Sequence, residues 1–565
     1  MRRVIALFML ICLLLTACGK SENPKKENVS SKKPSSSSTE SDVANEDEEL
    51  IEEEWEEEDE WDEEEEWDEF EDFEDDSPML SGTVYSEETD FSDDFEPSLS
   101  GTVINNVSDT EEYEKPESVF VDLQSGGYDE KAKDLRNTII NTKSSYDIKG
   151  TTYYISPKGD DFNSGTSPDD AWQTLDALMI NSFLIQPGDA VLFERGGVYR
   201  ANSSIIIATD DFILGAYGEG PKPCIYGSHM NYADEFIWES SSKKNIWKME
   251  FPLRDAGIMV FNNGEFAGIK RAGLAAAIQN GDFYHNTDEK MLYVYCDKGN
   301  PGKVWENIEI GTDQFIVSVY GNRHDIKIDN ICFKYTGAHA VDFFENNYNV
   351  SITNCEFGWI GGSIQSGVTR YGNAIQFWDS CWNVEVKNNW IYQVYDAGIT
   401  FQYSIFTDVE GGKYHDIEFS NNLIEYCSYS IEIFTSQNHG YMKNIHLNNN
   451  IMRFAGYGFG SQRPNSLNVS HICVWSVNYG KSVDNFNINN NIFDCSTTQA
   501  VDWAAGEVPH VGVNVSGNTF YQKAFANNPV MNFGVEGYTY ALNQSELEKA
   551  IATFDKSPKL VKWLE

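Results

Sequence analysis

A short phrase recurs through the second half of the chain, in which two apolar residues flank a polar one and an asparagine closes the phrase. The copies lie at 326–330, 350–354, 384–388, 417–421, 445–449 and 486–490, and a seventh, at 513–517, ends in glycine. The alternation predicts a strand with one buried face, and the last residue predicts a turn. Repeats of this length that each end in a turn are typical of the coils of a parallel β-helix.

A second alternating phrase follows each asparagine, and its central residues are predicted to form a column on an outer face. The members of this column are Asp342, Gln376, Thr400, Glu432, Gly460 and Asp502. Neighbouring members are expected about 4.8 Å apart, which is the spacing of adjacent strands. The phrase around Gln376 comes late, which predicts an inserted loop at 359–372.

The asparagine column itself is predicted to be structural, because stacked asparagines at a turn can hydrogen-bond along the ladder and tolerate a left-handed backbone. Eight cysteines lie in residues 150–565. Their spacing matches no zinc-binding pattern, so we interpret them as small buried residues and expect no metal site.

The first residues are predicted to be a signal peptide spanning 1–17. Arg2 and Arg3 precede a short apolar run at 4–15, which is too short to span a bilayer. The run ends in Leu-Thr-Ala-Cys at 15–18, which resembles a bacterial lipobox. The resemblance implies cleavage before Cys18, lipidation of its sulfur, and a lipid-anchored protein at the extracellular face of the bacterial cell membrane. The alternative is an ordinary secretory signal with a free Cys18.

Residues 18–117 are predicted to have no packed core. Residues 18–45 are a flexible tether rich in Ser and Lys, and 46–117 are a disordered acidic region. Residues 46–76 hold 24 acidic residues and no basic one, within a chain of formal net charge −49. Such a charge repels phosphate backbones and excludes nucleic acid as a partner. We interpret the tract as a self-repelling spacer, with docking to a basic partner as the alternative.

The rest of the chain is predicted to be one β-helix domain at 150–565 with capped ends. Residues 118–149 form the N-terminal capping region, because a helix is expected over 129–142. Short aromatic-rich strands at 230–310 predict an antiparallel insertion. A capping box that begins at Ser545 predicts a C-terminal helix at 545–554.

Two segments carry a resemblance to a known fold family. Residues 153–178, with Trp172 near their end, and residues 187–199, which begin Pro-Gly-Asp, resemble the entry and first coil of bacterial right-handed parallel β-helix proteins of the pectate-lyase-like superfamily, including β-helix glycoside hydrolases. The family usually has proline where this chain has Ala171. The resemblance implies an all-β, right-handed parallel β-helix solenoid and a polysaccharide or oligosaccharide partner. Hydrolases, lyases, epimerases and binding proteins share this scaffold.

Glycoside hydrolysis needs two carboxyl groups about 5–5.5 or 6.5–9.5 Å apart. Asp342 and Glu432 are three rungs apart, about 14 Å, which is too far. Glu432 and Asp502 are two rungs apart, about 10 Å, at the upper limit. Asp396 lies four residues before Thr400 and one rung from Glu432, so Asp396 and Glu432 are the predicted catalytic pair. Which of them is the acid stays open. The alternative is that Asp396 caps a turn and Glu432 is a solvated sheet residue.

Aromatic, amide and charged side chains gather around the column and in the long loops at 359–372, 403–416, 434–444 and 462–484. Sugar rings require flat apolar faces and many hydrogen-bond partners. The predicted substrate-binding residues are His339, Asp342, Arg370, Gln376, Trp378, Gln402, Tyr403, His439, Gln462, Arg463 and Trp475.

Two other kinds of function remain open, the first of which is a polysaccharide lyase or epimerase of the same fold. A lyase needs a basic residue and usually Ca²⁺, whereas a hydrolase needs no cofactor. Arg453 aligns with Glu425 and Asp494, which predicts an ion-pair ladder, so Arg370 and Arg463 are the lyase candidates. The other alternative is a glycan-binding or adhesive surface protein without catalysis.

Overall fold

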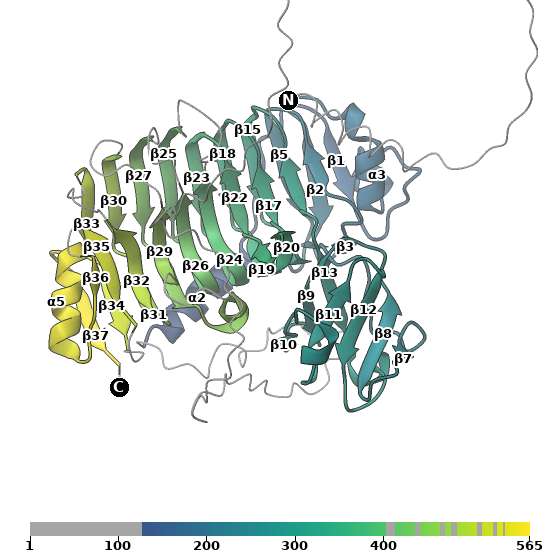
Figure 1. The fold of residues 1–565 in the computed structure, drawn as a ribbon. Coiled ribbons are helices and arrows are strands. Elements are labelled where there is room, and N and C mark those ends of the chain that lie inside the picture. The colour runs from purple at the N-terminus through teal and green to yellow at the C-terminus, as the bar shows by residue number, and fades with distance from the viewer. Residues whose placement is uncertain are drawn as a thin grey trace, which may run out of the picture. The chain divides into compact units, whose positions relative to one another are not determined.

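The computed structural model describes residues 127–402, 413–434, 441–463, 469–475, 483–504, 511–523, 528–534 and 537–564. The coils of these residues stack into a right-handed parallel β-helix (Figure 1). Each complete coil contributes strands to three parallel ladders. The predicted fold class is therefore confirmed. The predicted signal peptide, Cys18, the tether and the acidic region lie outside the described residues, as do 118–126 of the capping region.

The first ladder is a ten-stranded sheet that contains the asparagine-ended phrases. In order, its strands are β1 (Thr152–Ile155), β2 (Ala190–Glu194), β5 (Phe212–Tyr217), β15 (His324–Asp329), β18 (Asn347–Thr353), β23 (Cys381–Lys387), β25 (Lys413–Ser420), β27 (Tyr441–Asn448), β30 (Val483–Asn489) and β33 (Val513–Ser516).

The other two ladders form one eighteen-stranded sheet, because two long strands, β24 (Trp390–Gln402) and β26 (Leu423–Phe434), run through both. The ladder that we call the helix-side ladder contains β3 (Val198–Arg200), β6 (Cys224–Tyr226), β16 (Cys332–Thr336), β19 (Glu356–Ile360), the first halves of β24 and β26, β28 (Ile451–Ala455), β31 (Ile492–Ser496), β34 (Thr519–Gln522) and β37 (Leu560–Trp563). The site-side ladder contains β4 (Ile205–Ile207), β14 (Val317–Val319), β17 (Val341–Phe343), β22 (Ile375–Trp378), the second halves of β24 and β26, β29 (Ser470–Trp475), β32 (Gln499–Ala504), β35 (Met531–Gly534) and the antiparallel β36 (Tyr538–Thr539).

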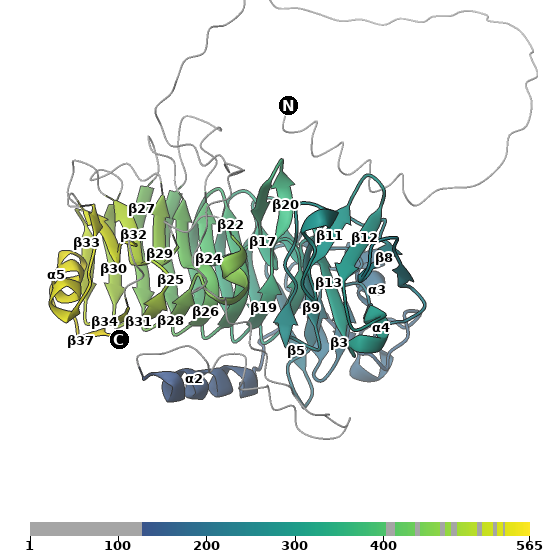
Figure 2. The same ribbon diagram turned by 60° about the horizontal axis from the view of Figure 1, so that its bottom comes forward.

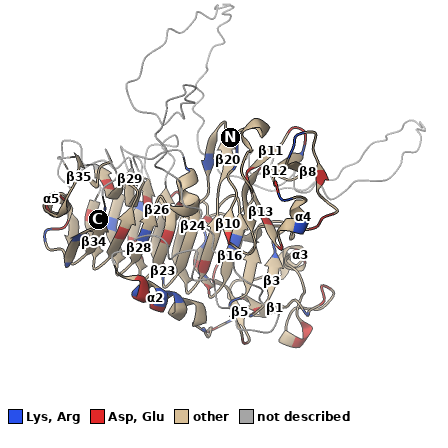
Figure 3. Ribbon diagram, turned by 90° about the horizontal axis from the view of Figure 1, so that it is seen from below, with Lys and Arg blue, Asp and Glu red and all other residues tan. Residues whose placement is uncertain are grey.

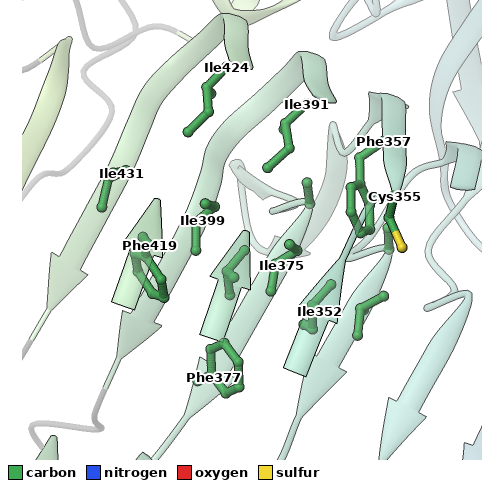
Figure 4. Packing of buried hydrophobic residues seen from close by; sticks show 14 of the residues in the cluster. Ile352, Cys355, Phe357, Ile375, Phe377, Ile391, Ile399, Phe419, Ile424 and Ile431 are labelled. Atoms are coloured by element: carbon green, nitrogen blue, oxygen red, sulfur yellow. The ribbon is translucent and has the colours of Figure 1, made fainter. Parts of the chain in front are cut away.

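The core lies inside the coils and is made of stacked apolar side chains. Figure 4 shows residues of successive coils, among them Ile352, Ile375 and Ile399, directed into the same interior. Phe343 stacks on Phe377 of the next coil, with ring centroids 4.7 Å apart. Because each coil buries its apolar face against its neighbours, one rung cannot be removed without exposing the next.

Left-handed backbone conformations turn the chain between ladders. The phrase-ending asparagines all adopt positive φ, for example 56° at Asn388 and 59° at Asn449, and Gly517 takes the same conformation. The hydrogen-bonded ladder is formed one residue later. Buried Asn389, Asn422, Asn450, Asn491 and Asn518 bond to one another in sequence, and the ladder ends at Asp555. The asparagines of the predicted column therefore form the turns, and the asparagine that follows each of the later ones forms the hydrogen-bonded ladder.

Residues that follow β6, up to and including β13, form the predicted antiparallel insertion. One sheet contains β7 (Glu239–Ser240), β8 (Ile246–Glu250), β11 (Phe283–Asn286) and β12 (Met291–Tyr295), and a second contains β9 (Ala256–Phe261), β10 (Phe266–Ala267) and β13 (Ile308–Thr312). The insertion has its own apolar core, which includes Trp238, Phe261 and Trp305. Figure 2 shows it beside the first coils.

The ends of the solenoid are covered by two helices. At the first coil, α3 (Leu175–Ile180) buries Leu175 and Leu178 in the main core. At the last coils, α5 (Gln544–Phe554) buries Leu547, Ile551 and Phe554 there. The C-terminal helix is therefore present, but its capping box is Asn543 with Glu546 rather than one beginning at Ser545, because the Asn543 side chain accepts a hydrogen bond from the Glu546 amide.

The helix predicted at 129–142 is present as α2 (Asp129–Asn141), but it does not cover an end. It lies along the outer face of the helix-side ladder (Figures 2 and 3). Its buried Ala132 and Ile139 pack in one cluster with Trp390 and Leu423. The helix takes this position because its charged residues pair with the ladder, as in the 3.0 Å bond from Arg136 to Glu425. No helix of the described residues is long and apolar enough to cross a membrane.

Candidate active site

The outward column of the site-side ladder is formed by register partners on eight strands. Its order is Ser318, Asp342, Gln376, Thr400, Glu432, Cys473, Asp502 and Asn532. The prediction that Gly460 occupies the rung after Glu432 is wrong. Gly456 and Gly458 turn the chain at positive φ into the 3₁₀ helix η5 (Gly458–Gln462), and the strand resumes only at β29, which places Cys473 there.

Glu432, in the middle of this column, is one of the two predicted catalytic carboxyl groups. Its residue is only 7% exposed, and its Oε2 accepts hydrogen bonds from Gln402 Nε2 at 2.8 Å and Thr400 Oγ1 at 3.4 Å. Gln402 therefore contacts the predicted catalytic carboxylate directly. Two donors stabilise the ionised form of a carboxylate.

Asp396 is the second carboxyl group, and it lies where β24 bends. The register of β24 against β26 shifts between Val394 and Ala397, which places Asp396 at an irregular position. The residue is 7% exposed, and Arg463 Nε lies 3.3 Å from its Oδ1. Arg463 follows η5 and also donates to the hydroxyl of Tyr429, over whose ring it lies.

The Arg463 guanidinium acts on both predicted catalytic carboxyl groups. Burial alone would lower the pKa of Arg463, but Asp396, Tyr429 and Glu432 together raise it. For Asp396 the balance is reversed, because burial raises its pKa and Arg463 only partly opposes that shift. Burial thus favours the protonated form of Asp396, while Glu432 accepts hydrogen bonds from two donors.

A second polar network occupies the earlier rungs. His339 Nδ1 accepts from the Asn373 amide at 2.8 Å, and burial lowers the pKa of His339 to about 3, so its ring is neutral. The Asn373 side chain donates to Gln376 at 2.7 Å, and Gln376 donates to Asp342 at 2.9 Å. Burial raises the pKa of Asp342 to about 8.

Asn373 joins this network to the first, because its Oδ1 accepts from the Ala397 amide at 2.8 Å, next to Asp396. Sequence patterns did not single out Asn373. Its position three residues before the column residue Gln376 is the signal that could have indicated it. Tyr429, three residues before Glu432, was missed in the same way.

Residues of two loops and the insertion border the site. Arg370 lies on the hairpin of β20 (Ser363–Ser366) and β21 (Thr369–Tyr371), with its guanidinium 4.4 Å from the Tyr395 ring centroid. It donates to the carbonyl oxygens of Gly362 and Gly257, the latter in the insertion. Gln462 likewise donates to the carbonyl oxygen of Gly268, also in the insertion, at 3.0 Å.

The remaining predicted residues are placed only in part. Trp378 is half-buried on β22 and is the register partner of Gln402. Tyr403 and His439 lie outside the described residues, and Trp475 is the last residue of β29. The structure thus brings Glu432 together with Gln402, Asp396 with Arg463, and His339 with Gln376 and Asp342 through Asn373. Asp342 and Glu432 remain three rungs apart.

The described residues include no group of three or more His, Cys, Asp or Glu side chains placed to hold a metal ion. Asp161, in the segment that resembles the β-helix entry, is not a metal ligand by this criterion. Its carboxylate accepts hydrogen bonds from the backbone amides of Gln173 and Thr174.

Comparisons with known proteins find a curated relative and several solved structures that resemble this chain. A lacto-N-biosidase of Bifidobacterium longum subsp. longum is 22% identical over 350 residues, which cover 51% of this chain and 21% of that protein. The chain therefore spans about a fifth of the length of this curated relative. No family model matches the chain.

Solved structures match at low identity. A structure titled glycoside hydrolase is 10% identical, with a TM-score of 0.40, and the match covers 73% of this chain and 97% of that one. A GH136 lacto-N-biosidase from Eubacterium ramulus is 12% identical, with a TM-score of 0.30, over 77% of this chain and 68% of that one. Alginate and pectate lyases also match. These are proteins that the chain is similar to, and its parallel β-helix fold is established by its own strand pairings.

Proposed function

We propose that this chain is a glycoside hydrolase that cleaves an oligosaccharide or polysaccharide with Asp396 and Glu432. The observation that carries the proposal is that Arg463 lies within electrostatic reach of two nearly buried carboxyl groups on neighbouring strands. Glycosidases need one carboxyl group that gives a proton and one that stays ionised. The similarity to a lacto-N-biosidase supports the same reaction class.

The environments suggest different roles for the two groups. We assign Asp396 as the general acid, because burial raises its pKa. We assign Glu432 as the nucleophile or base, because Gln402 and Thr400 donate to it. Arg463 is then a positioning residue that limits how far the pKa of Asp396 rises.

The test compares Asp396→Asn and Glu432→Gln with Asp502→Asn, a column carboxyl outside the pair. Reducing ends are measured on a panel of oligosaccharides and polysaccharides and on aryl glycosides. Both variants should lose about 10²–10⁴-fold in kcat/KM on sugar leaving groups. Asp396→Asn should retain more activity on aryl glycosides, whose leaving groups need no protonation, whereas Glu432→Gln should not. Asp502→Asn should stay near the unmodified protein.

Cleavage that survives both substitutions would contradict the assignment. Release of an unsaturated product that absorbs in the near ultraviolet would identify a lyase instead. The contacts do not favour that reaction, since Arg463 is paired with Asp396 and Arg370 donates to two carbonyl oxygens.

We also propose that the enzyme is anchored at the extracellular face of the cell membrane through Cys18. The lipobox-like sequence at 15–18 supports this. The membrane-bound form should carry acyl groups on its N-terminal cysteine, and Cys18→Ala should move the protein from the membrane to the soluble fraction. Equal membrane retention of that variant would refute the anchor.

A further inference from the structure

Two cysteines lie side by side in the helix-side ladder, on the strands that precede and follow the insertion. Cys224 begins β6 and Cys332 begins β16, and they are register partners on adjacent parallel strands. The residues after them, Ile225 and Phe333, are fully buried in the core, so both thiols lie on the outer face. Among the strand pairings of the described residues, no other register position sets cysteine beside cysteine.

The spacing of the two strands places the Cα atoms of the pair within the range that a disulfide can span. Adjacent strands lie about 4.7–4.9 Å apart, and disulfides join Cα atoms about 4.4–6.8 Å apart. A hydrogen bond joins the two thiols, and neither of these two cysteines is in a disulfide. Cys224 is partly exposed, whereas Cys332 is 1% exposed, so a reagent from solution reaches Cys224 first.

We propose that Cys224 and Cys332 form a reversible disulfide when the protein meets a small disulfide oxidant. The Cys224 thiolate attacks one sulfur of the oxidant, forms a mixed disulfide and expels one thiolate. The Cys332 sulfur, after losing its proton, attacks the sulfur of Cys224 and expels the second thiolate. Two cysteines are oxidised, the oxidant is reduced to two thiols, and these carry away both protons.

The bond would close a loop around the entire insertion, because the chain leaves the coils after β6 and returns through β13 and β14 before β16. The bond would therefore constrain the position where the insertion joins the coils. The insertion accepts hydrogen bonds from Arg370 and Gln462 beside the candidate active site. In-register side chains on parallel strands start about one strand spacing apart, which exceeds the usual Cβ separation of about 3.8 Å in a disulfide. The resulting strain makes the bond easier to reduce than a typical structural disulfide.

The test oxidises the folded, fully reduced chain with oxidised glutathione and counts thiols after denaturation. Two thiols per chain should disappear, a peptide linking Cys224 to Cys332 should appear in the digest, and reduced glutathione should restore both thiols without denaturation. Cys224→Ser and Cys332→Ser should each abolish the linked peptide. Cys495→Ser, which removes a buried cysteine on β31, should leave the loss of two thiols intact.

Peptide mapping of the unsubstituted chain decides the matter even where a variant fails to fold. Retention of all thiols overturns the proposal, and so does a linkage between other cysteines. A glutathione adduct that persists on Cys224 overturns it as well, because it shows that Cys332 does not attack.

Discussion

Two consecutive asparagines illustrate how residues of one type serve different purposes in this solenoid. Asn449 is exposed and takes a left-handed conformation with φ of 59°, whereas Asn450 is fully buried. The Asn450 side chain accepts from the Asn422 amide and side chain and donates to Phe419 and Asn491. Periodicity could reveal the repeating asparagines, but only the placed side chains distinguish the turn from the ladder.

We expect Asn450→Ala to destabilise the protein by about 3 kcal/mol, because it leaves buried donors and acceptors without partners. Asn449→Gly is the matched control and should cost less than about 1 kcal/mol, since glycine adopts positive φ freely. Chemical denaturation measures both free energies of unfolding. Equal effects would show that the buried ladder contributes no more than the turn.

The carboxyl group of Asp342 should make stability depend on pH. Burial raises its pKa from 3.8 to about 8, so the folded state binds this proton more tightly than the unfolded state does. Its contribution to stability is fully present below pH 4 and is lost as the pH rises through about 8. Asp342→Asn keeps an acceptor for Gln376 and cannot ionise. That variant should be more stable than the unsubstituted protein above pH 8 and show a flatter profile between pH 5 and 8 in denaturation at each pH.

At the scale of strands, alternation predicted register well wherever each coil contributes a site-side strand, even where a loop lengthens the coil. Asp342, Gln376, Thr400 and Glu432 occupy neighbouring rungs as predicted. The prediction failed at Gly460, because a 3₁₀ helix replaces a strand there and no alternation signals that change. The same element carries the chain to Arg463, whose pairing with Asp396 joins residues far apart in sequence and could not be read from spacing.

The predicted ladder of Glu425, Arg453 and Asp494 is an element-scale feature that the structure confirms. Arg453 lies 3.0 Å from Glu425 and 3.1 Å from Asp494, and both carboxyl groups are fully buried. Arg453→Met should cost about 3–5 kcal/mol, because it leaves two buried carboxylates without their shared cation. Adding Glu425→Gln and Asp494→Asn should recover part of that loss. A triple variant no more stable than Arg453→Met, measured by denaturation, would show that packing rather than charge dominates here.

At the scale of the whole described body, residues 128–149 form a strap along the outside of the coils. The strap runs from the last coils toward the first, opposite to the order in which the coils follow one another in the sequence. Tyr128 packs against Tyr521 of β34, near the last coil. Farther along, Arg136 contacts Trp390 and Glu425, and Tyr146 bonds to Asp329. The helix periodicity could predict α2, but the partner of its apolar face could not be predicted, because the ladder that receives it is assembled from strands of separate coils.

This strap should be part of the folded body rather than of the acidic region predicted at 46–117. Its removal would expose the apolar surface under Ala132 and Ile139 and deprive the buried Glu425 of Arg136. A chain that begins at residue 150 should therefore unfold at a lower denaturant concentration than one that begins at residue 127. The reduction should reach several kcal/mol, because burying each large apolar side chain contributes about 1.5–3 kcal/mol and the buried Glu425 keeps only one of its two cationic partners. Arg136→Met in the longer chain is the matched comparison, because it removes the charge and keeps the helix. If the two chains unfold at the same midpoint, α2 contributes nothing to the solenoid, and the body begins at residue 150.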